Sequence, residues 1–118
     1  MKLLTEEQFA QLLDNGRRQA AVKGTSDEID FHPVVKLFDP CGAGTWLLTE
    51  VEPEDPDIAW GLCDLGMGFP EFGTVRLSEL ASIKSRIGLG IERDLHFKAT
   101  KPISAYIDEA LKLERINA

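Results

Sequence analysis

The sequence predicts an α+β fold, a mostly antiparallel sheet of about four to five strands with helices packed on one face. Three segments of strand composition follow one another between residues 33 and 65, and their connections are too short for parallel crossovers. Helical patterns occur on both sides of these strands along the chain. With 118 residues, of which 43% are hydrophobic, the chain is expected to form a single domain over residues 1–118.

The first predicted helix begins after Thr5, which can act as its N-cap, with Gln8 at the capping-box position. Gly16 either ends this helix or lies inside a longer one that reaches Val22. Residues 23–32 are polar and are expected to form a loop.

Three strands are predicted after this loop. Residues 33–38 and 45–51 are rich in β-branched and aromatic side chains, and the turn residues between them indicate a hairpin. Residues 58–65 are almost continuously apolar, which is typical of an interior strand. The glycines of residues 66–73 indicate an irregular connection.

The C-terminal part predicts a short strand over residues 74–77 that leads into a helix capped by Ser78, with Leu80, Ile83 and Ile87 on its buried face. Residues 89–98 alternate between apolar and polar side chains, which predicts a half-buried strand. Pro102 can occupy the first turn of a final helix. Its predicted apolar face consists of Ile103, Tyr106, Ile107, Ala110 and Leu111.

Charge is distributed unevenly along this acidic chain, which has 13 basic and 20 acidic residues. From Leu37 to Val75 there is no Lys or Arg, whereas eight acids occur. The densest part, here called the acidic segment, runs from Glu50 to Asp57 and contains two prolines. It is either a solvated loop or a docking surface for a basic partner. Its acids are Glu50, Glu52, Glu54, Asp55 and Asp57. Direct binding of nucleic acid is not expected, because the chain has no basic stripe.

A second candidate site consists of Glu92, Asp94 and His96, which a strand would place in one row. Carboxylates and imidazole suit a divalent metal or an acid/base pair. Successive side chains on one face of a strand lie about 7 Å apart, so a shared metal would need a ligand from another strand. Asp64 or Glu50 could supply that ligand. The alternative is an ordinary solvated strand face.

Other side chains are expected to be structural. Trp46 and Trp60 are predicted in the sheet core, as is Cys63, whereas Cys41 is expected to be exposed in a glycine-rich turn. The glycines match neither a dinucleotide-binding nor a phosphate-binding loop, and no cofactor is expected.

Two bases fall at positions that a sheet would partly bury. Arg93 shares the predicted apolar face of its strand, and Lys36 lies in the middle of the first strand. Both are expected to form ion pairs, with Glu50 or Asp64 as candidate partners of Lys36.

The sequence also indicates the cellular compartment in which the protein is found. No apolar run approaches the roughly 18 residues that a membrane helix needs. The N-terminus becomes acidic at Glu6 and Glu7, before any apolar region of a secretory signal. A cytoplasmic protein is expected.

Five segments in succession resemble a family of small bacterial proteins known as a domain of unknown function. They span nearly the whole chain: Met1–Thr5, Pro33–Phe38, Thr45–Glu50, Gly61–Gly66 and Glu92–Phe97. Members of that family are frequent on conjugative plasmids, integrative elements and prophages. The resemblance implies an accessory protein of a mobile genetic element, similar in kind to anti-restriction and anti-CRISPR inhibitors, and it implies no catalytic residues.

The leading functional hypothesis is a non-enzymatic protein whose acidic segment binds a host or element protein with a basic surface. Its partner would be a nucleic-acid-handling defence complex, which it would inhibit. The first alternative is a metal-dependent hydrolase or nuclease that uses Glu92, Asp94 and His96 with Asp64. The second alternative is a regulatory module of plasmid maintenance.

Overall fold

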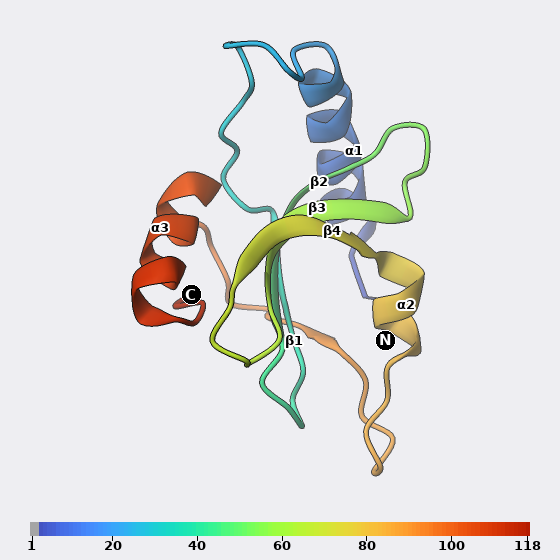
Figure 1. Cartoon of the computed structure of the whole chain (residues 1–118). Coiled ribbons are helices and arrows are strands. Elements are labelled where there is room, and N and C mark those ends of the chain that lie inside the picture. The colour runs from blue at the N-terminus through green and yellow to red at the C-terminus, as the bar shows by residue number, and fades with distance from the viewer. Residues whose placement is uncertain (1–2) are drawn as a thin grey trace.

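The computed structural model describes residues 3–118, so Met1 and Lys2 lie outside the described residues. It contains a five-stranded antiparallel sheet with the strand order β4-β3-β2-β1-β5 (Figure 1). The predicted α+β class and antiparallel sheet are confirmed. The elements in chain order are α1 (Glu6–Ala20), β1 (Val35–Phe38), β2 (Thr45–Val51), β3 (Ile58–Asp64), β4 (Glu71–Arg76), α2 (Leu77–Ser82), β5 (Glu92–Arg93) and α3 (Ile103–Leu113).

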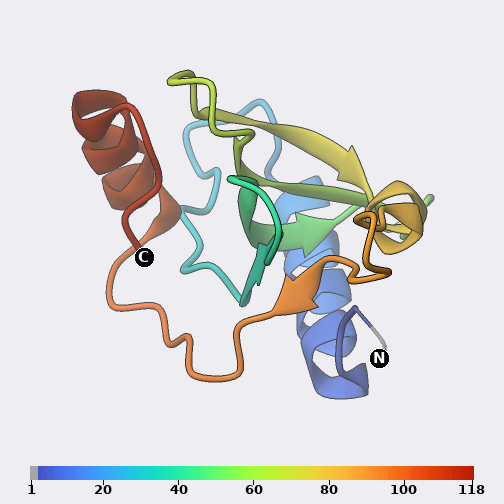
Figure 2. The same cartoon turned by 90° about the horizontal axis from the view of Figure 1, so that it is seen from below.

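The helices do not share one face of the sheet, as the sequence had suggested, but cover both. The neighbouring residues Leu47 and Leu48 on β2 point to opposite faces and belong to two separate cores. Leu48 packs in the core that contains Leu12 of α1, whereas Leu47 packs against α3. Figure 2 shows α1 and α3 on opposite sides of the strands. Both leucines are fully buried because each face has its own helix.

The start of α1 follows the predicted capping box. The Thr5 hydroxyl accepts a hydrogen bond from the backbone N–H of Gln8, and the Gln8 side chain accepts one from the backbone N–H of Thr5, each at 3.0 Å. The helix continues through Gly16. A Cβ atom there would lie 1.9 Å from the carbonyl oxygen of Val51, so glycine allows α1 to pack directly on the backbone of β2.

A β-bulge at Thr49 changes which face the end of β2 presents. Leu48 pairs with Gly61 and Glu50 pairs with Trp60, which leaves Thr49 as the extra residue. Without the bulge, Glu50 would share the face of Leu48 and point into the core beneath α1. The bulge places Glu50 beside Trp60 on the opposite face. The side-chain N–H of Asn15 on α1 donates to the Thr49 carbonyl at 2.9 Å and holds the bulge.

Strand β4 and helix α2 differ from the prediction in both length and capping. The strand starts at Glu71, three residues earlier than expected, and the helix ends at Ser82. Arg76, not Ser78, occupies the N-cap position. The chain after α2 forms a short hairpin instead of further helical turns, because the Ser85 hydroxyl accepts from the backbone N–H of Leu89 at 3.1 Å. Ile87, predicted on the buried face of a helix, is 76% exposed at its tip.

The strand predicted over residues 89–98 was also wrong in extent, since only Glu92 and Arg93 pair with β1. The chain turns at Asp94, whose carboxylate accepts from the backbone N–H of His96 at 2.9 Å. Leu95, expected on the buried face, is 68% exposed. Alternating hydrophobicity therefore did not correspond to an extended strand here.

Candidate functional site

The acidic segment forms the end of β2 and the tight turn into β3. Backbone hydrogen bonds close this turn, from Glu52 N–H to the Ile58 carbonyl and from Ile58 N–H to the Asp55 carbonyl, each at 2.9 Å. The two ends of the turn are thus fixed by the pairing of β2 with β3. The segment is an ordered part of the fold, and its five carboxylates have different environments.

Glu50 is not part of an exposed acidic surface. Its residue is only 7% exposed, and burial raises the pKa of its carboxyl group. The positive charge of Lys23 and a hydrogen bond from Gln19 oppose that shift. Glu50 therefore lies at the bottom of the site, where a docking partner protein would not contact it directly.

Asp57 holds the start of α2. Its carboxylate accepts hydrogen bonds from the backbone N–H of Ser78 at 2.9 Å and from the Ser78 hydroxyl at 2.7 Å. These bonds, with the neighbouring Arg76, lower the pKa of Asp57. The capping role assigned to Ser78 from the sequence is thus performed by a carboxylate 21 residues earlier.

Glu54 and Asp55 are the exposed acids of the segment. Asp55 lies 3.5 Å from the guanidinium group of Arg76, in an ion pair whose two side chains are both about half exposed. Such surface pairs contribute little to stability. These two carboxylates are the ones that a partner could contact without disturbing the fold.

Trp60 and Glu52 form the third part of the site. The indole N–H of Trp60 donates to Glu52 Oε1 at 2.5 Å, and the indole ring stacks on Phe72 of β4 with a centroid distance of 5.9 Å. Lys23 places its ammonium group 4.3 Å from the centre of the Trp60 ring and 3.5 Å from Glu52 Oε1. Trp46 is buried in the core as predicted, but Trp60 is only half-buried and lies on the other face.

This aromatic cluster was not found from the sequence. The pattern of β3 placed Trp60 in the core, because sequence alone does not reveal which face a bulged neighbour presents. One signal was available in the sequence. A hairpin of residues 45–51 and 58–65 brings Trp60 close to the acids of its turn. The cluster also contains Lys23, which was predicted only as part of the polar loop over residues 23–32.

The proposed metal ligands are dispersed. Asp64 is 4% exposed, and its carboxylate accepts from the backbone N–H groups of Gly66 at 2.8 Å and Ile116 at 3.0 Å. It therefore ties the C-terminal segment to β3. Glu92 lies on β5, whereas Asp94 and His96 lie in the turn that follows. Among residues 3–118, no three His, Cys, Asp or Glu side chains come together in an arrangement that could hold a metal ion.

Asp94 instead pairs with Lys36, at 3.5 Å. This pair corrects the expectation that Glu50 or Asp64 would neutralise Lys36. The Lys36 ammonium group also donates to the backbone carbonyl oxygen of Ala118. The hydrogen bond from His96 N–H, assisted by Lys36, lowers the pKa of Asp94.

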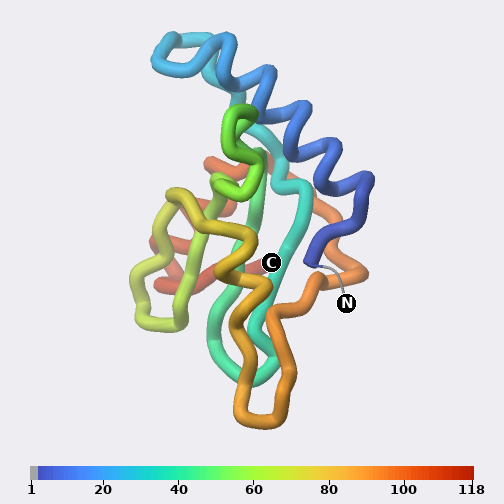
Figure 3. Tube along the Cα trace, turned by 90° about the vertical axis from the view of Figure 1, so that its right-hand side faces the viewer, coloured from blue at the N-terminus to red at the C-terminus, as the bar shows by residue number. Residues whose placement is uncertain are grey.

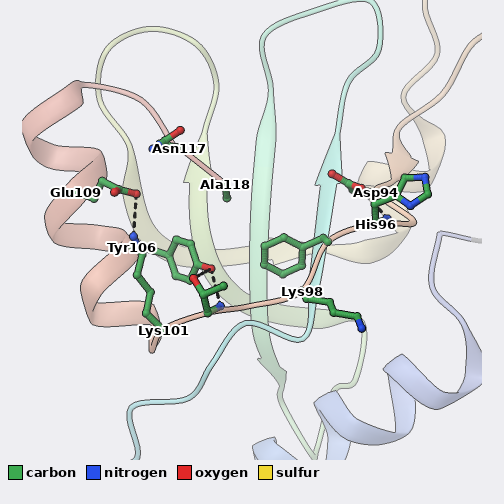
Figure 4. Close-up of a pocket in the computed structure, with 10 residues that line it drawn as sticks. Asp94, His96, Lys98, Lys101, Tyr106, Glu109, Asn117 and Ala118 are labelled. Atoms are coloured by element: carbon green, nitrogen blue, oxygen red, sulfur yellow. Dashed lines mark hydrogen bonds and ion pairs between the residues drawn. The ribbon is translucent and has the colours of Figure 1, made fainter.

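Asp94 and His96 line one side of an open cavity of about 450 Å³ beside α3 (Figure 4). On the other side, Lys101 lies 3.0 Å from Glu109, and the Tyr106 hydroxyl accepts from the backbone N–H of Thr100 at 3.1 Å. Asp94, Lys101 and Glu109 thus already have partners inside the protein. Its lining contains bases and acids in similar number and favours no particular ligand.

A family profile described as "Protein of unknown function (DUF2958)" matches residues 3–117. The chain belongs to this family. This confirms the resemblance to a domain of unknown function. The matched range includes the acidic segment, Trp60 and the turn at Asp94. No curated protein matches the chain, and neither does any solved structure.

Among residues 3–118, no helix has both the length and the apolar character that crossing a membrane requires.

Proposed function

We propose that this protein binds a basic surface of a partner protein through the exposed part of the acidic segment and the adjoining Trp60. In its specific form, the proposal is an accessory protein of mobile genetic elements that inhibits a nucleic-acid-handling defence complex, such as a CRISPR or restriction system. It acts in the cytoplasm, where such defence complexes operate.

The observation that carries the proposal is the juxtaposition of exposed carboxylates with a half-buried aromatic cluster. Glu54 and Asp55 lie at the turn between β2 and β3, and Trp60 follows on β3 beside the edge strand β4. Aromatic side chains are enriched at protein interfaces, and carboxylates supply the polar rim. Since residues 37–75 contain no base, the bases near these acids come from other parts of the chain.

The chemistry selects a basic partner. Carboxylates on a fixed turn present negative charges much as phosphates do, and they can occupy the Lys and Arg side chains that a nuclease complex uses for nucleic acid. Long-range attraction between opposite charges accelerates such association, and added salt screens it. Binding of this kind is expected to weaken as the salt concentration rises.

The test is affinity capture of the tagged protein from bacterial lysate that contains active defence systems, with mass spectrometry as the readout. The test variant is Glu54→Gln/Asp55→Asn, because these two acids do not hold the fold. The control variant is Asp14→Asn/Asp108→Asn, which removes the same charge from exposed positions on α1 and α3.

The proposal expects a basic, nucleic-acid-handling complex to be captured by the wild type and by the control at low salt, but not by the test variant. Equal capture by the two variants would contradict the acidic surface as the binding site. Capture of a plasmid partition or replication protein instead would retain the acidic surface and replace the inhibitory role by one in plasmid maintenance.

A further inference from the structure

The contact between Lys23 and Trp60 has the form of a recognition site for a cation. The ammonium group lies over the indole ring at 4.3 Å from its centre and within 3.5 Å of a Glu52 oxygen. Attraction to the ring face and to a carboxylate is how proteins bind Lys and Arg side chains of other molecules. We call the group formed by Trp60, Glu52 and Glu50 the cation seat.

The cation seat is built by the sheet and does not depend on Lys23 for its shape. The Trp60 ring is fixed on one side by its stack with Phe72 and at its edge by the hydrogen bond to Glu52. The bulge at Thr49 directs Glu50 to the same face, and Asn15 holds that bulge. A cation that enters the seat therefore meets an aromatic face and the Glu52 carboxylate already in position, with the buried Glu50 at the bottom of the seat.

Lys23, by contrast, comes from outside the sheet. It follows α1, which ends at Ala20, and lies in a turn that closes by a hydrogen bond from Thr25 N–H to the Val22 carbonyl at 3.1 Å. Its side chain is 48% exposed, and that of Glu52 is 34% exposed. The ammonium group can leave the seat by rotation of its own side chain, because no helical residue has to move.

We propose that Lys23 is an internal occupant of the cation seat, and that a Lys or Arg side chain of the basic partner displaces it on binding. The inference rests on the proposed function, which supplies the basic partner. The exposed acids Glu54 and Asp55, on the turn between β2 and β3, attract that partner, and the seat receives one of its side chains. Lys23 then limits affinity, since the partner binds only the fraction of molecules in which the seat is free.

The test uses Lys23→Met, which keeps a long apolar side chain but removes the ammonium group. A gain in affinity for basic ligands could also come from the lost positive charge alone. Lys84→Met controls for this, because it makes the same charge change in the hairpin after α2. That hairpin lies at one end of the molecule, and the acidic segment lies in the other half (Figure 3).

The probe is a penta-lysine amide with an acetylated N-terminus, and the same peptide with every side chain acetylated is the neutral control. The readout is the indole N–H signals in ¹⁵N-labelled protein, which report Trp60 and the buried Trp46 separately in one spectrum. The backbone signals of each variant show that it remains folded.

The proposal expects the Trp60 signal to shift with the charged peptide and not with the acetylated one, while Trp46 stays unchanged. Lys23→Met should bind about five-fold more tightly than Lys84→Met, which corresponds to about 1 kcal/mol for the released internal contact. In the Lys23→Met background, Trp60→Leu should remove that gain, with the peptide titration of this variant followed by its backbone N–H signals.

Equal affinities of Lys23→Met and Lys84→Met, or an unmoved Trp60 signal, would overturn the inference. These results are separable from a failure of the proposed function. If capture of the partner still depends on Glu54 and Asp55 while Lys23→Met has no specific effect, the acidic surface binds the partner and Lys23 is only a structural contact.

Discussion

The carboxylate of Asp57 caps the helix that contains Ser78, through bonds of 2.9 Å to its backbone N–H and 2.7 Å to its hydroxyl. One acid of the acidic segment thus joins the turn after β2 to the start of α2. Neutralising all the acids of the segment would therefore disturb the fold as well as the surface charge. Only Glu54 and Asp55 can be changed to examine binding alone.

Asp57→Ala is expected to lower the melting temperature, because the start of α2 loses its hydrogen-bond acceptor. The pKa of Asp57 is lowered from 3.8 by these bonds, so its stabilising effect is complete above that pH and is lost as the pH falls through the lowered value. The difference from wild type should shrink in acid. Thermal unfolding between pH 2 and pH 7 measures it, with Glu54→Ala as a control that should melt like the wild type at neutral pH.

Asn15→Ala is expected to destabilise the protein by about 1–3 kcal/mol, because the carbonyl of Thr49 would lose its buried partner. The bulge should loosen, and the Trp60 indole N–H signal should move with it. Urea unfolding and a ¹⁵N spectrum check both effects. Gln11→Ala, which removes only the hydrogen bond from Gln11 to Asn15, should cost less. An equal loss in both variants would show that the bulge does not depend on Asn15.

Glu50→Gln is expected to stabilise the protein at pH 7. Burial raises the pKa of Glu50 above 4.5, so the folded state favours the protonated form and ionisation at neutral pH opposes folding. Removing the charge relieves this cost, and the gain should vanish as the pH falls below 4.5. Urea unfolding at pH 4 and pH 7 tests this, and a gain of equal size at both values would contradict it. Since Lys23 offsets part of the cost, Lys23→Met should enlarge the gain at pH 7.

The two cysteines are expected to differ in reactivity. Burial, with a smaller effect of Glu71, raises the pKa of Cys63 to about 11, whereas Cys41 is exposed. At pH 8, a thiol reagent should modify Cys41 in the folded protein and reach Cys63 only after unfolding. Counting reactive thiols in the wild type and in Cys41→Ser, with and without denaturant, measures this. Rapid reaction of folded Cys41→Ser would show that Cys63 is accessible.

The elements that sequence predicts well are those specified by neighbouring residues. The capping box of Thr5 and Gln8, the hairpin of β1 and β2, and the amphipathic pattern of α3 all depend on positions close in the chain. Each agreed with the structure to within a few residues.

The region after α2 was predicted poorly because short polar contacts overrode the hydrophobic pattern. Ser85 and Asp94 each bind a backbone N–H group and turn the chain, which leaves Ile87 and Leu95 exposed. The same limit applies to the site. The face on which Glu50 lies depends on a bulge fixed by Asn15, 34 residues away from Thr49, and that contact exists only once the fold has formed.

The central claim is that exposed carboxylates of the acidic segment bind a basic partner. The most direct test is the dissociation constant of the captured partner as a function of salt concentration, for wild type, Glu54→Gln/Asp55→Asn and Asp14→Asn/Asp108→Asn. The account predicts that the Glu54/Asp55 variant binds more weakly at low salt and depends less on salt, so that its affinity approaches that of wild type at high salt. Three superimposed salt curves would contradict it.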